Sequence, residues 1–227
     1  MSDRDVLVRA DALDRVHGSG RDAVAAVLDA SFAIFSGDRI AIVGPSGSGK
    51  STLLHLIAGL DTPTSGSITW PALGGREQLR PGPVALAFQG PSLLPPLSVA
   101  ENVALPVLLR GGGETEAMQV AREMLERFEL TEIADKLPEE ISGGQSQRAG
   151  LARALAGSPT LVLADEPTGQ QDHETGMHVL DTLLELVSAS GAAVVVATHD
   201  LAVADRQPIR WTMAGGRLAS EVATCSA

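Results

Sequence analysis

Two stretches of this sequence combine glycines and hydroxyls in the way that phosphate-binding loops do. The first, GPSGSGKS, covers residues 44–51 and satisfies the pattern G-x-x-x-x-G-K-[ST] in full. The second, ISGGQSQR, covers residues 141–148 and leads into a helical pattern. Glycines have no Cβ, so successive backbone N–H groups can converge on phosphate oxygens. A single chain of 227 residues therefore carries two candidate anion cradles.

The first cradle predicts a site for a nucleoside triphosphate. RIAIVG before it indicates a buried strand, and STLLHLIAGL after it indicates a helix that ends at Gly59, which is the context that the motif requires. We expect Lys50 to reach the β- and γ-phosphates and Ser51 to hold Mg²⁺ at the positive end of the helix dipole. A flexible glycine turn is the alternative interpretation. The predicted nucleotide contacts in this cradle are Gly44, Pro45, Ser46, Gly47, Ser48, Gly49, Lys50, Ser51 and Thr52.

An acidic pair in LVLADEP complements this cradle. Asp165 ends an apolar strand, where we expect it to bind Mg²⁺ directly or through a water. Glu166 beside it is placed to orient or deprotonate an attacking water. Taken alone, such a pair more often caps the next helix. Because it accompanies a phosphate loop, the pair favours hydrolysis of ATP or GTP with Mg²⁺.

The elements around these residues predict an α/β protein. The first forty residues alternate short β-like stretches, DVLVRA and VAAVLDASFAIF, with turns, and two more strands are expected at 65–70 and 84–88. TLVLAD and AAVVVATHD are unalternated apolar runs, which are typical of central strands in a parallel sheet. IRWTMAGGRLAS resembles a hairpin around Gly215 and Gly216.

Between Gly90 and Pro159 the apolar period becomes helical. Ser98 and Glu101 have capping-box spacing, and ISGGQSQR opens a helix that closes near Gly157. A third helix is expected to bury one face, made of Ala117, Val120, Ala121, Met124, Leu125 and Phe128. We therefore predict one domain over residues 1–227, with a core and β-subdomain at 1–89 and 160–227 and a helical subdomain at about 90–159.

Composition excludes several classes of protein. Seventeen basic and 28 acidic residues give 17 − 28 = −11, which disfavours a nucleic acid partner. One cysteine, Cys225, cannot form a disulfide framework, fits a cytosolic setting and is assigned no function. The charged start lacks a signal peptide's apolar core, and no apolar run approaches the ~18 residues that span a bilayer. Abundant alanine and only two lysines indicate a GC-rich bacterial genome.

The two cradles, the acidic pair and the helical insertion, in this order, resemble the ATP-binding cassette (ABC) subunits of transporters. ISGGQSQR is similar to the family's signature, usually written LSGGQ. The resemblance implies a P-loop NTPase core with a mainly parallel sheet, an N-terminal antiparallel β-subdomain and a helical insertion. It also implies ATP and Mg²⁺ as cofactors and an ATP-dependent head-to-tail homodimer. In that dimer the signature of one chain covers the ATP on the P-loop of the other, through Ser142, Gly143, Gly144 and Gln145.

The resemblance assigns roles to three further residues. Gln89 would contact the metal and the nucleotide and mark the groove that receives a separately encoded membrane permease. His199 would be a catalytic contact to the γ-phosphate, and Asp172 would lie in the loop through which the two subunits communicate. Such a subunit is peripheral, on the cytoplasmic face of the cell membrane. SLLPPLSVAENVALP most resembles cassettes that serve lipoprotein release, macrolide export and cell division.

The apolar loop PSLLPPL itself predicts a docking surface near Gln89 and Leu93. The alternative is that its leucines pack beneath the helical insertion. Where the family has an aromatic residue against adenine, this tyrosine-free chain has His17, for which a surface turn is the other interpretation. Two further departures are a short loop at 71–83 and Gln171, which stands where leucine is common.

Two other classes of function remain to be weighed. A soluble cassette protein of DNA repair or translation usually needs a long coiled-coil insertion or two cassettes in one chain, and this sequence has neither. A P-loop kinase or GTPase would make the resemblance of ISGGQSQR to the signature accidental. Dependence of ATP hydrolysis on a membrane partner would separate a transporter subunit from the soluble cassette, and nucleotide preference would test the kinase or GTPase.

Overall fold

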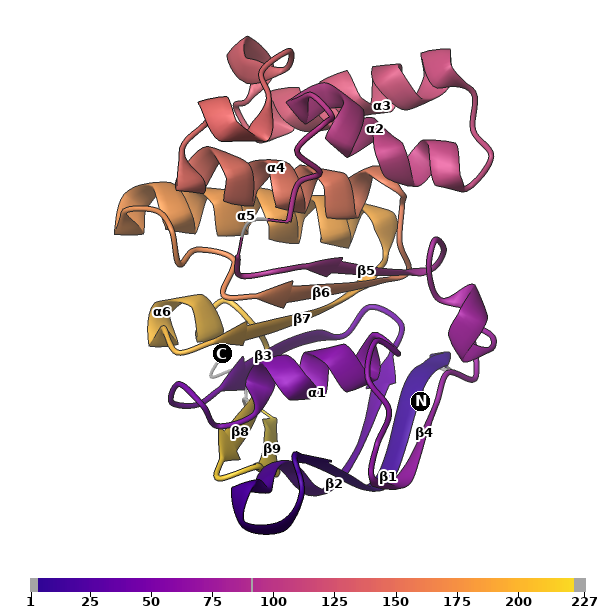
Figure 1. The fold of residues 1–227 in the computed structure, drawn as a ribbon, viewed down its shortest axis with the longest axis vertical. Helices are drawn as coiled ribbons and strands as arrows, with labels where there is room; N and C mark the ends of the chain where they lie inside the picture. Colours follow the sequence, from indigo (N-terminus) through magenta and orange to yellow (C-terminus); the bar gives the residue numbers. More distant parts are fainter. Residues whose placement is uncertain (1–3, 91, 223–227) are drawn as a thin grey trace.

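The computed structural model describes residues 4–90 and 92–222, which form a nine-stranded mixed sheet with helices on both faces (Figure 1). The strand order across the sheet is β4-β1-β2-β9-β8-β3-β7-β6-β5. The strands are β1 Val6–His17, β2 Val24–Phe35, β3 Arg39–Val43, β4 Ser65–Thr69, β5 Val84–Ala87, β6 Leu161–Asp165, β7 Ala193–Thr198, β8 Ile209–Ala214 and β9 Arg217–Val222. The α-helices are α1 Lys50–Ile57, α2 Val99–Leu109, α3 Glu114–Arg127, α4 Gly143–Ala156, α5 His173–Ser190 and α6 Leu201–Ala204.

Five adjacent strands, β8, β3, β7, β6 and β5, run parallel and make the core of the sheet. Their side chains alternate between two layers, as the strand period of two requires. Leu161 and Leu163 of β6 pack in the layer of α1, whereas Val162 and Ala164 pack in the layer of α4 and α5. Because both faces are covered, the central strands β6 and β7 are almost wholly apolar and buried, and the expected parallel core is confirmed.

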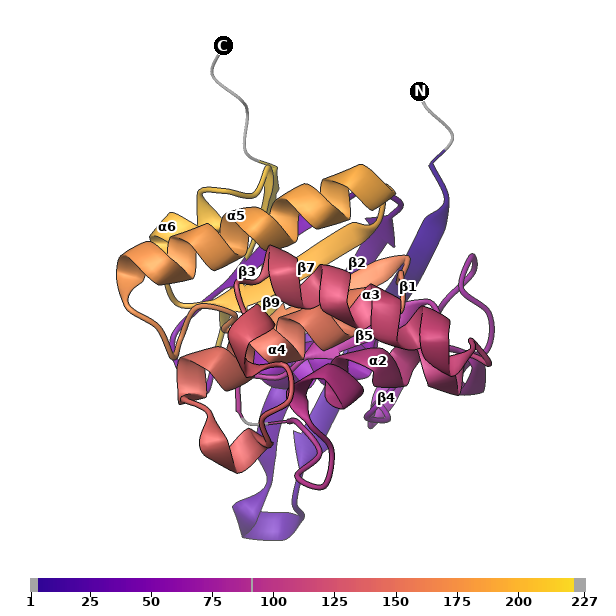
Figure 2. The same ribbon diagram turned by 90° about the horizontal axis from the view of Figure 1, so that it is seen from above.

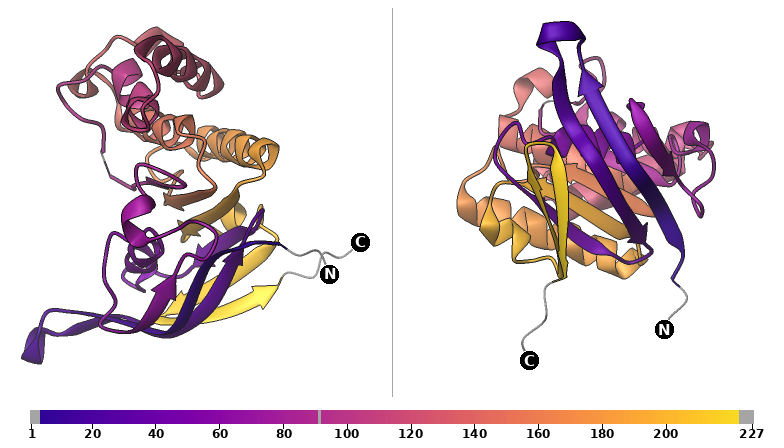
Figure 3. Two further views of the ribbon diagram at one scale, coloured as in Figure 1. Left: turned by 90° about the vertical axis from the view of Figure 1, so that its right-hand side faces the viewer. Right: turned by 90° about the horizontal axis from the view of Figure 1, so that it is seen from below.

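The remaining strands are mainly antiparallel and form the other end of the sheet. β1 pairs with β2 and with β4, and β8 turns into β9 at Gly215 and Gly216 as the sequence predicted. β2 coincides with the predicted stretch VAAVLDASFAIF, whereas β1, also twelve residues, is longer than the predicted DVLVRA, and the hairpin of the two strands extends away from the body (Figure 3). Register shifts between the two strands, and left-handed backbone at Ala12 and Asp29, interrupt the alternation of inward and outward side chains from which the length of β1 could be predicted.

Helices α2, α3 and α4 lie between β5 and β6 in the chain and stack beyond them in space (Figures 1 and 2). The predicted capping box is present, because the Glu101 N–H donates to the Ser98 hydroxyl at 3.2 Å and the Glu101 carboxylate accepts from the Ser98 N–H at 2.7 Å. The buried face of α3 includes Ala117, Ala121 and Leu125. Fully buried Asn102 donates to the carbonyl of Leu94 and accepts from its N–H, which fixes the loop before α2.

The longest helix, α5, was not assigned from the sequence. Its N-terminus is capped by Asp172, which accepts a hydrogen bond from the Thr175 N–H at 3.0 Å. Leu180, Leu183 and Val187 are buried against the sheet at helical spacing. Their spacing of three and four residues is the sequence signal that predicts an amphipathic helix here. In the described part of the chain, no helix has both the length and the apolar character to cross a membrane.

Candidate nucleotide-binding and catalytic site

Three adjacent parallel strands end at one place and bring the predicted catalytic residues together. In the sheet Val43 of β3 pairs with Thr198 of β7, and Ala197 of β7 pairs with Asp165 of β6. The P-loop follows β3, Glu166 follows β6, and His199 follows β7. Ligands of open α/β sheets bind outside the carboxyl ends of their strands, and this arrangement gives such a site.

Close contacts with backbone fix the shape of the P-loop. A Cβ on Gly49 would lie 1.9 Å from the carbonyl oxygen of Ala26, and Gly49 has a left-handed φ of 104°. A Cβ on Gly44 would lie 2.1 Å from the carbonyl oxygen of Met213. Because backbone atoms cannot swing aside as side chains do, these two positions require glycine. The loop is therefore held against β2 and β8 and leads directly into the N-terminus of α1.

Lys50, the first residue of α1, is only 6% exposed. Its Nζ donates to the carbonyl oxygens of Gly44 at 2.8 Å and Pro45 at 3.2 Å. The same nitrogen lies 3.8 Å from Oε1 of Glu166. A buried ammonium needs such partners, because an unpaired charge away from water is costly. Lys50 thus joins the P-loop to the acidic residue that follows β6.

The carboxylate of Glu166 is held through both of its oxygens. Oε1 lies 2.9 Å from Nδ1 of His199, and Oε2 accepts from the Thr198 hydroxyl at 3.2 Å. An ionised carboxylate can only accept, so Nδ1 of His199 carries the hydrogen when Glu166 is ionised. Glu166 is 7% exposed, whereas the His199 side chain is 65% exposed. The imidazole therefore covers the carboxylate on the solvent side.

Asp165 and Ser51 form a small oxygen-rich group beside this carboxylate. Burial raises the pKa of Asp165, and a hydrogen bond from Ser51 opposes that rise. Two buried oxygens, Oδ1 of Asp165 and the Ser48 hydroxyl, have no hydrogen-bond partner within residues 4–90 and 92–222. The described residues hold no cluster of three or more His, Cys, Asp or Glu side chains for a metal. Mg²⁺ characteristically uses one or two carboxylates together with substrate phosphates and waters, so this donor set fits it.

The two remaining predicted contacts of this cradle differ in what surrounds them. Nε2 of His17 lies 3.5 Å from the Thr52 hydroxyl, so the end of β1 reaches the first turn of α1. Gln89 is exposed and follows β5, the neighbour of β6 in the sheet. Its backbone therefore leaves the sheet at the same edge as Glu166, although the structure records no bond between the two side chains.

The second cradle is the N-terminus of α4. The Ser142 hydroxyl accepts from the Gln145 N–H at 3.2 Å, and the side-chain Oε1 of Gln145 accepts from the Ser142 N–H at 2.9 Å. Gly143 and Gly144 begin the helix and are exposed or half-buried. The hydrogen bond that the Thr175 N–H donates to the Asp172 carboxylate lowers the pKa of that carboxyl. These groups line a hollow of about 420 Å³, made by residues 142–145, Arg148, residues 170–172 and Thr175, without any P-loop residue.

Two buried polar residues of the site were not predicted. Gln147 of α4 donates to the backbone carbonyl of Glu166 at 2.7 Å, and Thr198 donates to the Glu166 carboxylate. Gln147 lies in the predicted motif without a role assigned to it. It shares the buried stripe of α4 with Gly150, Leu151 and Ala154, and a polar residue on such a stripe is the signal that could have identified it.

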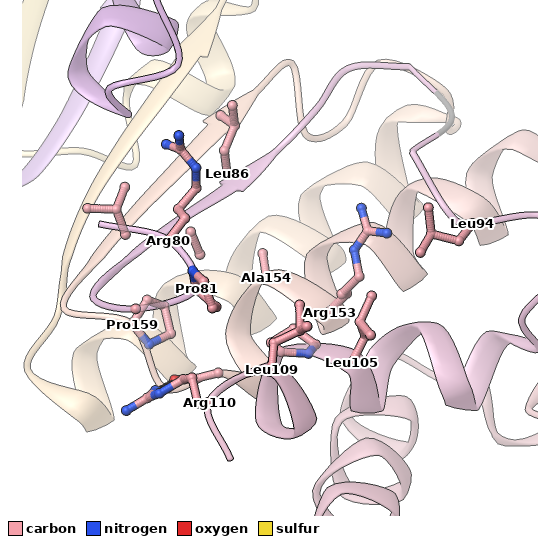
Figure 4. Close-up of a pocket in the computed structure, with 15 residues that line it drawn as sticks. Arg80, Pro81, Leu86, Leu94, Leu105, Leu109, Arg110, Arg153, Ala154 and Pro159 are labelled. Atoms are coloured by element: carbon pink, nitrogen blue, oxygen red, sulfur yellow. Dashed lines mark hydrogen bonds between the residues drawn. The ribbon is translucent and has the colours of Figure 1, made fainter. Parts of the chain in front are cut away.

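A groove of about 440 Å³ lies between β5, α2 and α4 (Figure 4). Leu94, Leu105 and Leu109 give it an apolar wall, and Leu109 is 60% exposed. Arg153 lines the groove and donates to both oxygens of Ser92 at 2.8 Å, and burial lowers the pKa of its guanidinium. Leu93 belongs instead to the core beneath the helices. Of the two adjacent leucines in PSLLPPL, Leu93 packs inward and Leu94 faces the groove.

Comparison with known sequences gives a family and several relatives. A family model described as ABC transporter matches residues 27–169. The lipoprotein-releasing system ATP-binding protein LolD of Legionella pneumophila (strain Paris) is 42% identical over 209 residues, covering 89% of this chain and 92% of the relative. LolD of Shewanella sp. (strain MR-7) is 38% identical over 225 residues, covering 95% and 96%.

Solved structures agree with this relationship. The ATP-binding cassette MJ0796, in a dimeric post-hydrolysis state bound to ADP and Pi, matches with a TM-score of 0.88 and 33% identity, covering 96% of this chain and 99% of that one. CbiO1 of Clostridium perfringens, part of the ABC transporter complex cbiONQ, matches with a TM-score of 0.80 and 26% identity, covering 96% and 89%. The chain therefore belongs to the ABC transporter family and is an ATP-binding, ATP-hydrolysing subunit of such a transporter.

Proposed function

We propose that this subunit hydrolyses ATP as a head-to-tail homodimer and thereby powers a separately encoded membrane permease. The observation that carries the proposal is the separation of the two cradles, because the hollow at Ser142 contains no P-loop residue. A second phosphate-binding loop that does not face the chain's own nucleotide site is explained if it faces the site of a partner. The dimeric state described for MJ0796 supports this arrangement.

In the first cradle, P-loop N–H groups and Lys50 bind the phosphates of ATP. Ser51, Asp165 and Gln89 hold Mg²⁺, which when bound neutralises charge on the phosphate oxygens. Glu166 accepts a proton from the attacking water, or orients that water, as its position at the end of β6 allows. His199, which already meets Glu166 at 2.9 Å, fixes the carboxylate and reaches toward the γ-phosphate.

In the second cradle, Ser142 and the N–H groups of Gly143 and Gly144 contact the γ-phosphate held by the partner. The Ser142 hydroxyl oxygen accepts from the Gln145 N–H, so its own hydrogen can donate to phosphate without breaking that bond. Hydrogen bonds to charged groups are worth about 1.5–3 kcal/mol each. Since ADP has no γ-phosphate, these contacts exist only with ATP, and hydrolysis opens the dimer. Asp172 lies in the loop that joins the two subunits.

His17 stacks on the adenine ring in this proposal. Its contact with Thr52 places the imidazole beside the helix that follows the P-loop. An imidazole offers less π surface than tyrosine, so adenine binding is weaker here than with a tyrosine.

The groove lined by Leu94, Leu105 and Leu109 receives a cytoplasmic segment of the permease. Its exposed leucines are the kind of apolar patch that marks an interface. The system is of the lipoprotein-releasing type, as the names of the relatives suggest, and the subunit is peripheral on the cytoplasmic face of a bacterial membrane. A soluble role in DNA repair or translation would leave this groove without an occupant.

The experiment that tests the dimer mixes two inactive variants. Lys50→Ala spoils the P-loop, and Ser142→Arg blocks the signature with a bulky cation. In a head-to-tail mixed dimer both lesions fall at one shared site, and the other site is intact. We expect the mixture to regain hydrolysis that neither variant shows alone.

A control must first show that the two variants associate and that one intact site turns over, for which a dimer of wild type and Lys50→Ala serves. With that control passed, a mixture that stays inactive at every ratio would contradict the proposal that Ser142 acts on its partner's ATP. For the permease, the rate of ATP hydrolysis by the subunit is compared with and without the co-purified membrane protein. A Leu109→Asp variant is expected to keep the rate of the subunit alone and to lose the stimulation by the membrane protein.

A further inference from the structure

The backbone of Glu166 is held in an unusual conformation. Its φ is +47°, in the left-handed region that residues with a Cβ rarely occupy. Such a residue costs on the order of 1–3 kcal/mol and persists only where its surroundings over-determine it. The N–H of Glu166 donates to the Ala197 carbonyl at 2.9 Å, which ties one side of the residue to β7. The other side must therefore be held by its carbonyl group.

The Glu166 carbonyl oxygen has two donors, and one comes from a distant part of the chain. The Gly169 N–H donates to it at 3.1 Å, and Nε2 of Gln147 donates at 2.7 Å. A carbonyl oxygen has two lone pairs, so both are used. Gln147 is 8% exposed and projects from α4, one turn after the helix begins at Gly143. The signature helix thus reaches the main chain of the residue proposed as the catalytic base.

The other end of the Gln147 amide holds the loop between β6 and α5. Oε1 of Gln147 accepts from the Gln170 N–H at 3.2 Å and from Nε2 of Gln171 at 3.3 Å. Both ends of the amide agree on its orientation, since a carbonyl needs a donor and an N–H needs an acceptor. One buried side chain therefore bonds the signature helix to Glu166 and to the loop that ends at Asp172.

We propose that Gln147 is a positioning residue for Glu166, and that it transmits movement of the signature helix to the catalytic carboxylate of the same chain. The helix is rigid, so a shift at Ser142 moves the Gln147 amide and with it the Glu166 carbonyl. In the head-to-tail dimer, on which this second part rests, Ser142 serves one ATP and Glu166 serves the other. Gln147 then links the two ATP sites within a single chain.

The test uses two variants and matched controls. Gln147→Met keeps the length of the side chain and removes its hydrogen bonds. Gln147→Glu keeps an acceptor toward Gln170 and can donate to the Glu166 carbonyl only when its new carboxyl is protonated. The controls are Gln119→Met and Gln119→Glu on the exposed face of α3. For each protein the kcat and KM of ATP hydrolysis, the ATP affinity of the monomer and the melting temperature are measured.

We expect Gln147→Met to lower kcat at least about tenfold, which is part of the ~10²–10⁴-fold that a positioned base contributes. The ATP affinity of the monomer should change less than about twofold, because the P-loop is untouched. For Gln147→Glu, the ratio of its kcat to that of wild type should rise as pH falls from about 8 to 6, because burial keeps the new carboxyl protonated to higher pH. Taking the ratio removes any pH dependence of hydrolysis that the two proteins share.

A kcat of Gln147→Met within about twofold of wild type, in a protein that melts normally, would overturn the proposal. If neither variant folds, Gln147 serves stability alone and the assignment is wrong. Wild type that hydrolyses ATP without dimerising would refute the proposed dimer and still leave the positioning of Glu166 open to this test. Loss of cooperativity in ATP in Gln147→Met, with a dimer still formed, would support the link between sites.

Discussion

The two glycine-rich cradles of this chain differ in how they are held. The P-loop is fixed by backbone, because Gly44 and Gly49 lie against the carbonyls of Met213 and Ala26, and Lys50 is buried among acceptors. The signature cradle lies against a side chain that can move, because a Cβ on Gly143 would meet the far end of the Gln170 side chain at 2.4 Å. In the proposed dimer the first cradle binds its nucleotide with its own chain's residues, and the second is an open half-site. In that proposal the more rigid cradle is the one that serves its own chain's nucleotide.

The largest expected effect separates the cradles by the binding of ATP to the monomer. Lys50→Ala removes two hydrogen bonds to phosphate, worth about 1.5–3 kcal/mol each, so the affinity should fall at least about a hundredfold. Ser142→Arg should leave the affinity of the monomer unchanged, because its cradle does not hold that nucleotide. Calorimetric titration of both variants checks this, and equal losses in the two would mean that both cradles serve one nucleotide.

A second substitution separates binding from chemistry inside the first cradle. Glu166→Gln keeps the shape of the side chain but removes the base, so turnover should fall by about 10²–10⁴-fold while ATP stays bound. The protein should then accumulate as an ATP-bound dimer on size-exclusion chromatography. Asp181→Asn, on the exposed face of α5, is the control for loss of a carboxylate. Hydrolysis at the wild-type rate would remove Glu166 from the proposed mechanism.

Glycine substitutions test the difference in rigidity directly. Gly49→Ala meets backbone at a left-handed φ, and these two costs together should destabilise the fold by roughly 2–5 kcal/mol. Gly143→Ala stands in the first turn of α4 beside a side chain that can move, and alanine is a better helix former by about 0.5–1 kcal/mol. We expect the melting temperature to drop only for Gly49→Ala. A comparable drop for both would show that the second cradle is as rigid as the first.

The sequence predicted that the residues of the first cradle would lie close together, because they follow strands whose apolar runs are continuous. Strands β3, β6 and β7 had to be central and parallel, so their carboxyl ends had to meet. The hydrogen bonds that connect the two cradles could not be predicted from the sequence. The bond from Gln147 to Glu166 joins residues 19 apart, and its acceptor is a backbone carbonyl, which any residue type has. The length of β1 was hidden by its bulges. The division into subdomains at about 90 and 159 stays a prediction.

Each cradle has a nearby carboxyl group whose pKa is shifted in the folded protein. The charged form of the first, Asp165, should destabilise the fold. Burial raises the pKa of Asp165 above its ordinary value of 3.8, so its charged form is disfavoured in the folded protein. The cost begins as pH rises above 3.8 and is complete above the folded pKa. Asp165→Asn should therefore melt at a higher temperature than wild type at pH 7 and lose hydrolysis. Melting curves from pH 7 to about 3.8 should show the gain vanish on acidification.

The smallest expected effect is the opposite response of Asp172 at the second cradle. The Thr175 N–H lowers its pKa below 3.8, so the folded protein favours the charged form. That stabilisation is complete above 3.8 and is lost as pH falls through the folded pKa. Asp172→Asn keeps a side chain that caps helices equally well, so only the charge changes. It should melt slightly below wild type at neutral pH, with a difference that shrinks in acid. If Asp172→Asn instead melted above wild type at neutral pH, as Asp165→Asn is expected to do, the charged carboxylate would destabilise the fold at both cradles. The two cradles would then not differ in this respect.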